Sequence, residues 1–350
     1  MDTTVTSASR HRRARERLLR HTTACWSTQA LGVAVEMDLP DRLAAGPASA
    51  ATLATDCGAP AEALQRLLRA LCTLDVCREG RDGRFALAAG GESLRRDATA
   101  DSPSLRAIVQ WWAGPMWSLW PELEYSVRTG LSARERRIGQ PGYAFLDAQP
   151  EMAAVFHQAM QAMTTMVTDD IVALDFWREV RHVVDVGGGN GTLAAALVEA
   201  HPHLHASIVD RADAEVSAGA LIRTKGIAPR CRFVVGDFFV EVPAGSDVYM
   251  LKSILHNWDD TTCARILSCC AQAAARGSRL LLVERVRPQR LLPRQHDTAL
   301  ARTDLNMLTG LGGRERTRDE FSALLAAAGF ELVAVRSTSF EFSALEARRT

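Results

Sequence analysis

Residues 183–191 read VVDVGGGNG, a short apolar run that leads directly into a glycine-rich turn. A helix is predicted to begin at Thr192, so the turn joins the end of a strand to the start of a helix. Glycines at this place let the backbone turn sharply and approach a ligand where a Cβ would collide. Free amides at the helix start attract an anionic group. The stretch favours a nucleotide-binding βα unit, although a tight turn without any ligand has the same local pattern.

Outward from this turn, the second half of the chain alternates short valine- and isoleucine-rich runs with alanine-rich segments. The runs predict strands at 180–186, 206–209, 232–235, 248–251 and 279–283. The segments between them predict helices at 192–200, 213–225 and 260–275. Strands that alternate with helices indicate an α/β fold with a parallel sheet and right-handed crossovers.

The first half has the pattern of a helical domain with one short hairpin. Leucines recur at helical spacing between residues 64 and 74, and VCREGRDGRFAL (residues 76–87) predicts two short strands around Gly83. Helix, turn, helix and a two-stranded wing are the outline of a winged-helix unit. We assign residues 1–100 to this unit, residues 101–178 to a helical connector and residues 179–350 to the α/β domain.

Composition excludes several classes of protein. The 350 residues are 47% hydrophobic and 23% charged, as in an ordinary globular protein. The 41 basic and 41 acidic residues cancel, which argues against a protein that grips nucleic-acid backbones. Eight cysteines without a C-x-x-C pair favour a reduced, cytoplasmic protein without a metal or disulfide framework. The arginine-rich N-terminus lacks the apolar core of a secretory signal, and no apolar stretch is long enough to span a membrane.

Three successive strand ends point to the ligand. Thr192 stands where the dinucleotide fingerprint needs its third glycine, so NAD remains only an alternative. Asp210 ends the next strand and suits a ribose diol. Gly236-Asp237-Phe238 ends the strand after that, and an acid beside an aromatic ring can hydrogen-bond an adenine amine and stack on its ring. One adenosine with an amino-acid tail, S-adenosylmethionine (SAM), fits this series better than a dinucleotide.

Four ordered stretches carry a resemblance to a known family: VVDVGGGNG, GDF (residues 236–238), LKSILHNWDD (251–260) and GGRERT (312–317). They resemble the motif series of the caffeic-acid-type, SAM-dependent O-methyltransferases, above all the bacterial branch that modifies aromatic antibiotics. The first half is similar as well, in ALGVAVEMDLPDRLAAGP (30–47), ALQRLLRAL (63–71) and FHQAM (156–160). The resemblance implies a Rossmann-like SAM-binding domain at the C-terminus and a winged-helix dimerisation domain at the N-terminus. It further implies a homodimer that methylates an aromatic small molecule without a metal.

The resemblance also assigns roles to single residues. His256 matches the catalytic base, and Glu284 and Glu315 match the two acids that flank it. Asn257 stands where the family often has Asp, which removes a charge near the base. Together with the strand-end residues, the expected cofactor site comprises Asp185, Gly187, Gly189, Asp210, Gly236, Asp237, Phe238, Lys252 and Thr164. The acceptor is expected to be lined by Phe156, Met160, Met163, Asn306 and Met307, although a methionine and aromatic stripe at helical spacing is also typical of a core.

The chemistry of a phenol agrees with a histidine base. A phenol has a pKa of about 10 and needs a base to become a nucleophile at neutral pH. Histidine titrates near that pH, and a carboxylate on its second ring nitrogen fixes the tautomer. A second histidine cluster, at 201, 203 and 205, spans a loop and a strand start and does not predict a metal site.

Two other functions stay open from the sequence. A relative of this family with SAM bound can catalyse decarboxylation or hydroxylation instead of methyl transfer. The winged-helix outline also fits a DNA-binding regulator, with a basic face at Arg66, Arg69, Arg78, Arg81 and Arg84 that acidic residues interrupt.

Overall fold

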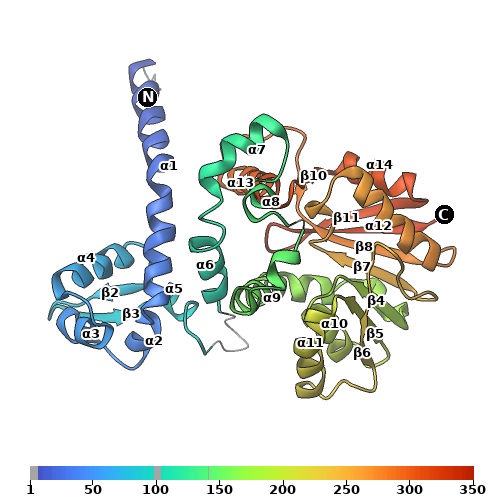
Figure 1. Ribbon diagram of the computed structural model, residues 1–350, viewed down its shortest axis with the longest axis horizontal. Helices are drawn as coiled ribbons and strands as arrows, with labels where there is room; N and C mark the ends of the chain where they lie inside the picture. Colours follow the sequence, from blue (N-terminus) through green and yellow to red (C-terminus); the bar gives the residue numbers. More distant parts are fainter. Residues whose placement is uncertain (1–6, 98–103, 141) are drawn as a thin grey trace, which may run out of the picture. The chain divides into compact units, whose positions relative to one another are not determined.

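The computed structural model describes residues 7–97, 104–140 and 142–350. It contains two compact units, residues 1–118 and residues 119–350 (Figure 1). The residues assigned above to a helical connector are divided between the units, and the long helix of the FHQAM segment belongs to the second. None of the described helices is long and apolar enough to cross a membrane.

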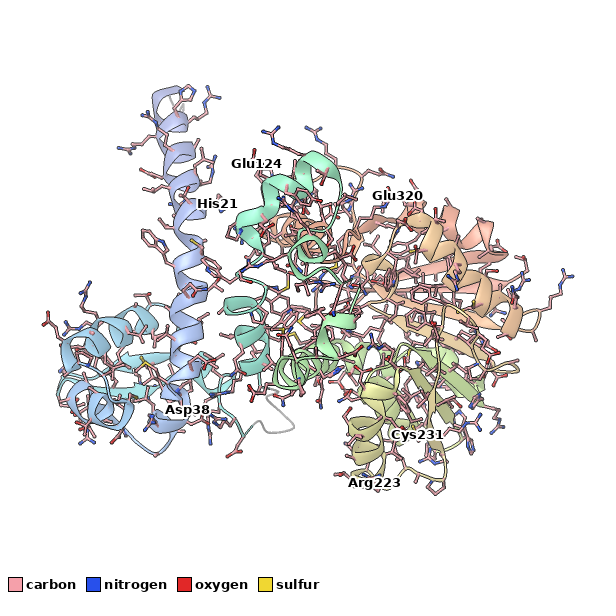
Figure 2. All side chains as sticks on the ribbon, viewed as in Figure 1. His21, Asp38, Glu124, Arg223, Cys231 and Glu320 are labelled. Atoms are coloured by element: carbon pink, nitrogen blue, oxygen red, sulfur yellow. The ribbon has the colours of Figure 1, made fainter. Side chains whose placement is uncertain are left out.

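The first unit is helical with a small sheet. Its elements are α1 (Ser7–Glu36), α2 (Leu39–Ala44), β1 (Ala48–Ser49), α3 (Ala50–Cys57), α4 (Ala61–Cys72), β2 (Cys77–Glu79), β3 (Arg84–Leu87), α5 (Ala89–Glu92) and α6 (Arg106–Ala113). Strand β3 pairs with both β1 and β2 in antiparallel fashion, which gives the predicted wing a third strand. Leu64, Leu68 and Leu71, on one face of α4, are buried in the core beside Phe85 of the wing. Asp38, labelled in Figure 2, holds the buried Arg106 of α6 against the start of α2.

The second unit begins with short helices and one long one. These are η1 (Trp120–Glu122), α7 (Leu123–Thr129), α8 (Ala133–Ile138), η2 (Ala144–Leu146), α9 (Pro150–Val172) and η3 (Asp175–Glu179). The α/β part follows with β4 (His182–Val186), α10 (Thr192–Ala200), β5 (His205–Asp210), α11 (Ala212–Thr224), β6 (Cys231–Val235), β7 (Val248–Lys252), η4 (Leu255–Asn257), α12 (Asp260–Ala273), β8 (Arg279–Glu284), β9 (Val286–Arg287), α13 (Gln295–Leu311), β10 (Arg316–Thr317), α14 (Arg318–Ala327), β11 (Phe330–Ser337) and β12 (Ser343–Arg349).

The main sheet has seven strands in the order β11-β12-β8-β7-β4-β5-β6. The five neighbouring strands β8, β7, β4, β5 and β6 are parallel. Strand β12 runs antiparallel to both of its neighbours, β8 and β11. The predicted α/β fold class is therefore confirmed. Strands β11 and β12 were not predicted from the sequence, and for β12 the reason is its composition, because SALEARR carries the alanine, glutamate and arginine of a helix rather than the pattern of a strand.

Burial on both faces explains why the central strands are uniformly apolar. Four successive residues of β7, from Val248 to Leu251, have no exposed surface. Helices α12 and α14 pack on one face of the sheet, where Ile266, Leu267 and Phe321 join the same core as Tyr249 and Leu251. The start of α14 is fixed by a capping box between Thr317 and Glu320, labelled in Figure 2.

The histidines near residue 203 have structural roles. The Nε2 of His201 lies 3.0 Å from the carbonyl oxygen of Val172, and the Nε2 of His203 lies 3.0 Å from that of Trp177. Both rings tie the loop before β5 to the segment that leads into β4. Among the described residues, no group of three or more histidine, cysteine or acidic side chains is arranged to hold a metal ion.

Candidate active site

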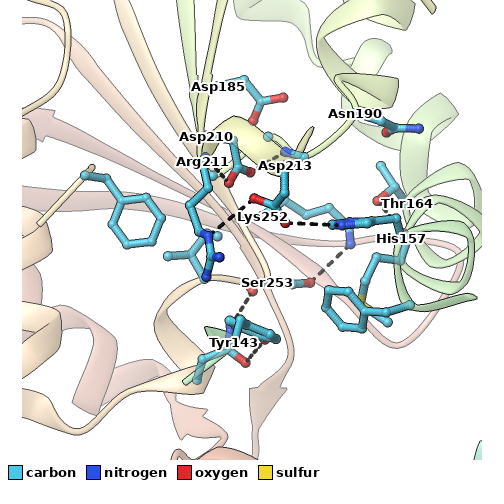
Figure 3. Close-up of a pocket in the computed structure, with 18 of the residues that line it drawn as sticks. Tyr143, His157, Thr164, Asp185, Asn190, Asp210, Arg211, Asp213, Lys252 and Ser253 are labelled. Carbon is cyan, nitrogen blue, oxygen red and sulfur yellow. Dashed lines mark hydrogen bonds and ion pairs between the residues drawn. The ribbon is translucent and has the colours of Figure 1, made fainter. Parts of the chain in front are cut away.

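A cavity of about 460 Å³ opens at the carboxyl ends of the parallel strands (Figure 3). It is lined by the ends of β4, β5, β6 and β7 on one side and by helix α9 on the other. Carboxyl ends of parallel strands are where α/β sheets bind their ligands. The structure brings all of the predicted cofactor residues into this one cavity: Asp185, Gly187, Gly189, Asp210, Gly236, Asp237, Phe238, Lys252 and Thr164.

The glycine turn after β4 has the conformation that only glycine adopts readily. Gly187 and Gly189 have φ angles of 71° and 58°, in the left-handed region. A Cβ on Gly187 would also overlap the side chain of Ile254. The carboxylate of Asp210 accepts the Gly189 amide at 2.6 Å and the Arg211 amide at 2.7 Å, so the end of β5 holds the turn in place.

Two titratable side chains of the cavity wall, Asp185 and Lys252, have shifted pKa values. Burial and the nearby Asp210 carboxylate raise the pKa of Asp185 to about 7. Burial and the neighbouring Arg285 lower the pKa of Lys252 to about 8, and its Nζ donates to Ser253 Oγ at 3.1 Å. Turn amides, two acids and one cation form a donor and acceptor set that fits a nucleoside with a zwitterionic amino-acid tail.

The catalytic group expected from the sequence also assembles. His256 lies in η4, which is separated from the end of β7 by two residues, and only 6% of its surface is exposed. Its Nδ1 is 3.3 Å from Glu284 Oε2 and 3.7 Å from Glu315 Oε1, and neither glutamate side chain has any exposed surface. The second Glu284 oxygen accepts the amides of Ile254 and Leu255 at 2.9 and 2.8 Å. Glu284 thus orients both the imidazole ring and the backbone turn that carries it.

The two carboxylates determine the proton affinity of the imidazole. Burial disfavours the charged ring, but Glu284 and Glu315 outweigh this effect and raise the pKa of His256 above 6.5. Burial raises the pKa of Glu284 as well. For Glu315, burial acts in the same direction, but His256 and Arg285 outweigh it and lower its pKa. Glu315 is therefore the carboxylate that carries a negative charge opposite the imidazole.

Two residues that hold the turn carrying His256 were not predicted from the sequence. Arg316 is completely buried and donates to the carbonyl oxygens of Leu255 and Trp258 at 2.8 and 2.7 Å, while its Nε binds Asp260 at 3.0 Å. Gly313 packs so closely that a Cβ would lie 2.5 Å from the Asn257 carbonyl carbon. Both residues belong to the GGRERT stretch, whose interior arginine and glycines give no local signal of these contacts.

We expect Arg316→Lys to destabilise the second unit by about 2–4 kcal/mol, because the single nitrogen of an ammonium cannot reach the three acceptors that the separate Nε, Nη1 and Nη2 atoms of the guanidinium bind. Urea denaturation of the purified protein measures this loss. Arg314→Lys is the matched control: Arg314 also pairs with Asp260, but its side chain is 45% exposed, so less than about 1 kcal/mol is expected. Equal losses in the two variants would contradict the role assigned to Arg316.

The predicted acceptor residues are only partly brought together. Phe156 and Met160 of α9 line the cavity, whereas Met163, Asn306, Met307 and His256 itself do not. The cavity is instead lined by residues on both sides of His256, among them Ile254 and Trp258. The acceptor roles of Met163, Asn306 and Met307 stay predictions.

Asn257 and Tyr143 add a polar contact to the same wall. The Tyr143 hydroxyl donates to Asn257 Oδ1 at 3.1 Å, and Asn257 Nδ2 donates to the Ser253 carbonyl at 2.9 Å. An aspartate at position 257 would place a carboxylate against that carbonyl, which explains why an amide suits this turn. No local pattern in the sequence marked Tyr143, which lies between α8 and α9.

Comparison with known proteins agrees with this geometry. Residues 120–331 match the O-methyltransferase domain, and residues 19–94 match the O-methyltransferase dimerisation domain. The chain is 35% identical over 332 residues to the phenazine O-methyltransferase of Lysobacter antibioticus, covering 95% of each chain. It is 33% identical over 335 residues to the aclacinomycin 10-hydroxylase of Streptomyces purpurascens, covering 91% of this chain and 86% of that one.

A solved structure gives the same fold. It is an O-methyltransferase from neocarzinostatin biosynthesis in complex with S-adenosylmethionine and 2-hydroxy-5-methyl naphthoic acid. The TM-score is 0.77 and the identity 34%, with 92% of this chain and 96% of that chain covered. The matched domains, the coverage of these relatives and the shared fold lead to one conclusion: the chain belongs to the O-methyltransferase family, with the dimerisation domain of that family at its N-terminus.

Proposed function

We propose that this protein methylates a hydroxyl group of an aromatic secondary metabolite, with His256 as the general base. The protein is a SAM-dependent O-methyltransferase, so the cofactor predicted from the sequence is confirmed. The observation that supports the proposed base is the placement of His256, whose Nδ1 faces two buried carboxylates while its turn borders the cofactor cavity. Bound SAM supplies an electrophilic methyl group on a sulfonium sulfur.

The residues of the chain then have separate tasks. Gly187, Gly189 and Asp210 hold the cofactor at the sheet edge. Asp237 hydrogen-bonds the adenine amine, and the ring of Phe238 stacks on the adenine. Lys252 and Asp185 line the same cavity, and each affects the pKa of the other. Much of the rate of an in-line displacement comes from alignment of the reactants and exclusion of water, so a rigid cavity itself contributes to the rate of methyl transfer.

His256 removes the proton from the acceptor hydroxyl. With Glu284 and Glu315 at Nδ1, that nitrogen carries the hydrogen and Nε2 keeps the lone pair that accepts the proton. The imidazolium that forms is stabilised by the same two carboxylates. A phenol, with a pKa of about 10, gains most from such a base.

The cavity wall suits a flat aromatic acceptor. Tyr143, Phe156, Met160 and Trp258 present rings and a thioether to it, and the Tyr143 and Phe156 ring centroids are 5.3 Å apart. Two of the proteins compared above are a phenazine O-methyltransferase and an O-methyltransferase in complex with 2-hydroxy-5-methyl naphthoic acid. We therefore propose a phenolic, fused-ring or single-ring metabolite of the antibiotic type as the acceptor.

For the first unit we propose a role in homodimerisation rather than in DNA binding. The match to the dimerisation domain supports this assignment. Within the basic face that suggested DNA binding, Arg69 is already paired with Glu79 through two hydrogen bonds of 3.1 and 3.0 Å. Such a pair weakens the face as a phosphate-binding surface.

The experiment that tests the proposed function uses SAM labelled at the methyl group and a panel of phenolic acids, hydroxynaphthoates and hydroxyphenazines. Methyl transfer replaces the hydroxyl hydrogen of the acceptor by the labelled methyl group, so the product carries the label and one additional CH₂ unit. Loss of CO₂ or addition of oxygen, with the label retained in SAM, would instead assign this chain to a diverted reaction like that of the hydroxylase relative.

A further inference from the structure

Phe342 is a buried aromatic residue that the mechanism above does not use. It lies on the turn between β11 and β12, and 2% of its surface is exposed. Two cations lie over its ring: the Lys252 Nζ is 5.0 Å from the ring centroid, and the Arg285 Cζ is 4.3 Å from it. A cation within about 6 Å of a ring centroid is attracted by the negative face of the ring, most strongly where water is excluded. The ring of Phe342 therefore stabilises both charges.

Lys252 is the cation of this pair that lines the cofactor cavity (Figure 3). Its Nζ donates to the neutral hydroxyl of Ser253. Burial and Arg285 lower the pKa of Lys252 to about 8, while Glu284 and Asp185 act in the opposite direction. With a pKa this close to neutral pH, a modest contact decides how much of the side chain is charged. The ring of Phe342 supplies such a contact.

Two contacts with other parts of the unit fix the turn that carries Phe342. The amide and the hydroxyl of Ser339 donate to the two carboxylate oxygens of Asp170, in helix α9, at 2.8 and 3.0 Å. Glu341 accepts a hydrogen bond of 3.2 Å from the Nε of Arg285, which directly follows β8. The turn is thus tied both to α9 and to the end of β8, so the position of the ring is fixed by the fold.

We infer that Phe342 is a positioning residue for cofactor binding, whose ring holds the Lys252 ammonium at the cavity in its charged form. The group that gains from this charge is the carboxylate on the amino-acid tail of SAM, since a hydrogen bond between two charged groups is stronger than one between neutral groups. The inference rests on the proposed place of Lys252 in the cofactor site. It adds a residue that does not itself line the cavity.

The first test measures the charge of Lys252 directly. The sequence contains two lysines, Lys225 and Lys252, so full-length protein labelled with [ε-¹³C]lysine has one NMR signal for each. Without ligand, the Lys252 signal is expected to titrate near pH 8. In Phe342→Leu, which stays apolar but lacks the ring, this titration should move down by about 0.5–1 pH unit, because the ammonium loses its stabilising contact. Lys225 is the internal control, since it pairs with Glu199 at a side-chain exposure of 44% and should not respond.

Three further variants separate the ring from a general effect of the turn. Phe342→Tyr keeps a ring and should titrate as the unmodified protein does. Phe340→Leu makes the same change at the neighbouring aromatic residue of the turn and should leave the Lys252 titration in place. A Lys252 titration that is unchanged or moved to higher pH in Phe342→Leu, or moved equally in Phe340→Leu, would overturn the inference. Thermal unfolding shows whether Phe342→Leu folds, and Phe342→Met, which also lacks the ring, takes its place if it does not.

The second test connects this charge to the cofactor, by isothermal titration with S-adenosylhomocysteine (SAH). Phe342→Leu should bind SAH about three- to fivefold more weakly than the unmodified protein at about pH 8.5, and almost equally at about pH 6.5, where Lys252 is charged in both. Asp185, Glu284 and Arg285, the other charged groups that act on Lys252, are the same in both proteins. Equal affinities at both pH values, or an equal loss at both, would overturn the inference. Failure of the unmodified protein to bind SAH is a different result and would contradict the proposed function.

Discussion

Replacement of His256 by Gln is expected to lower turnover by about a hundredfold or more, because the acceptor hydroxyl then has no base in reach. Glutamine fills a similar volume and cannot accept a proton at neutral pH. The two carboxylates at 3.3 and 3.7 Å lose the cation that they stabilise, so the loss falls on the chemical step. Single-turnover assays with saturating SAM and acceptor measure that step directly.

Binding of the cofactor separates this explanation from a general disruption of the site. His256 does not line the cavity that holds the nine predicted cofactor residues, so His256→Gln should bind SAH within about threefold of the unmodified protein. A variant with unchanged turnover would contradict the assignment of the base. A variant that loses SAH binding and turnover together would show that His256 is needed for structure rather than for proton transfer.

Replacement of Gly313 by Ala is expected to be the second most damaging change, although it adds a single methyl group. The new Cβ would overlap the carbonyl oxygen of His256 and crowd the Asn257 carbonyl group. The catalytic turn must move to accommodate it, since the Arg314 amide also donates to the His256 carbonyl at 2.9 Å. Crowding of this kind lowers the free energy of unfolding by about 1–3 kcal/mol. A displacement of His256 by about 1 Å lowers the rate of methyl transfer about a hundredfold.

Gly312→Ala is the matched control for this prediction. Gly312 has a φ angle of 72°, so alanine there is strained by about 1–2 kcal/mol, but its Cβ would meet nothing closer than 3.8 Å. We expect both variants to be less stable in thermal unfolding and only Gly313→Ala to be slow in single turnover. Equal turnover of the two variants would mean that the 312–317 segment does not position His256.

Much of the α/β fold follows from local patterns in the sequence. Helix α10 begins and ends at the predicted residues, because a glycine turn precedes Thr192 and a proline follows His201. The five strands that were expected are all present. Strands β4, β5, β7 and β8 are mostly buried and therefore have apolar runs, whereas β6, at the edge of the sheet, is only half-buried. Strand β12 escaped detection because SALEARR lacks a strand pattern, and its place in the sheet depends on antiparallel pairing with β8 and β11, which no local pattern reveals.

The candidate site also has residues that could be predicted from the sequence and residues that could not. Strand ends converge by topology, so Asp185, Asp210 and Asp237 could be placed together from the sequence. The contacts of Arg316 and Gly313 join segments about sixty residues apart, and that of Tyr143 with Asn257 spans 114 residues. Such contacts depend on how helices and turns pack after the sheet has formed, and side-chain type alone does not specify them.

The pH dependence of the single-turnover rate tests the central claim most directly. The carboxylates raise the pKa of His256 above 6.5, and only the neutral imidazole accepts a proton, so the rate should rise with pH through a pKa higher than that of an ordinary histidine. Glu315→Gln removes one carboxylate and should shift this rise to lower pH; Glu315 suits the test because Glu284 also binds two backbone amides. A rise that moves to lower pH in Glu315→Gln is the predicted result. A rate that is independent of pH between about 5.5 and 9, or a profile that Glu315→Gln leaves in place, would contradict proton transfer to His256.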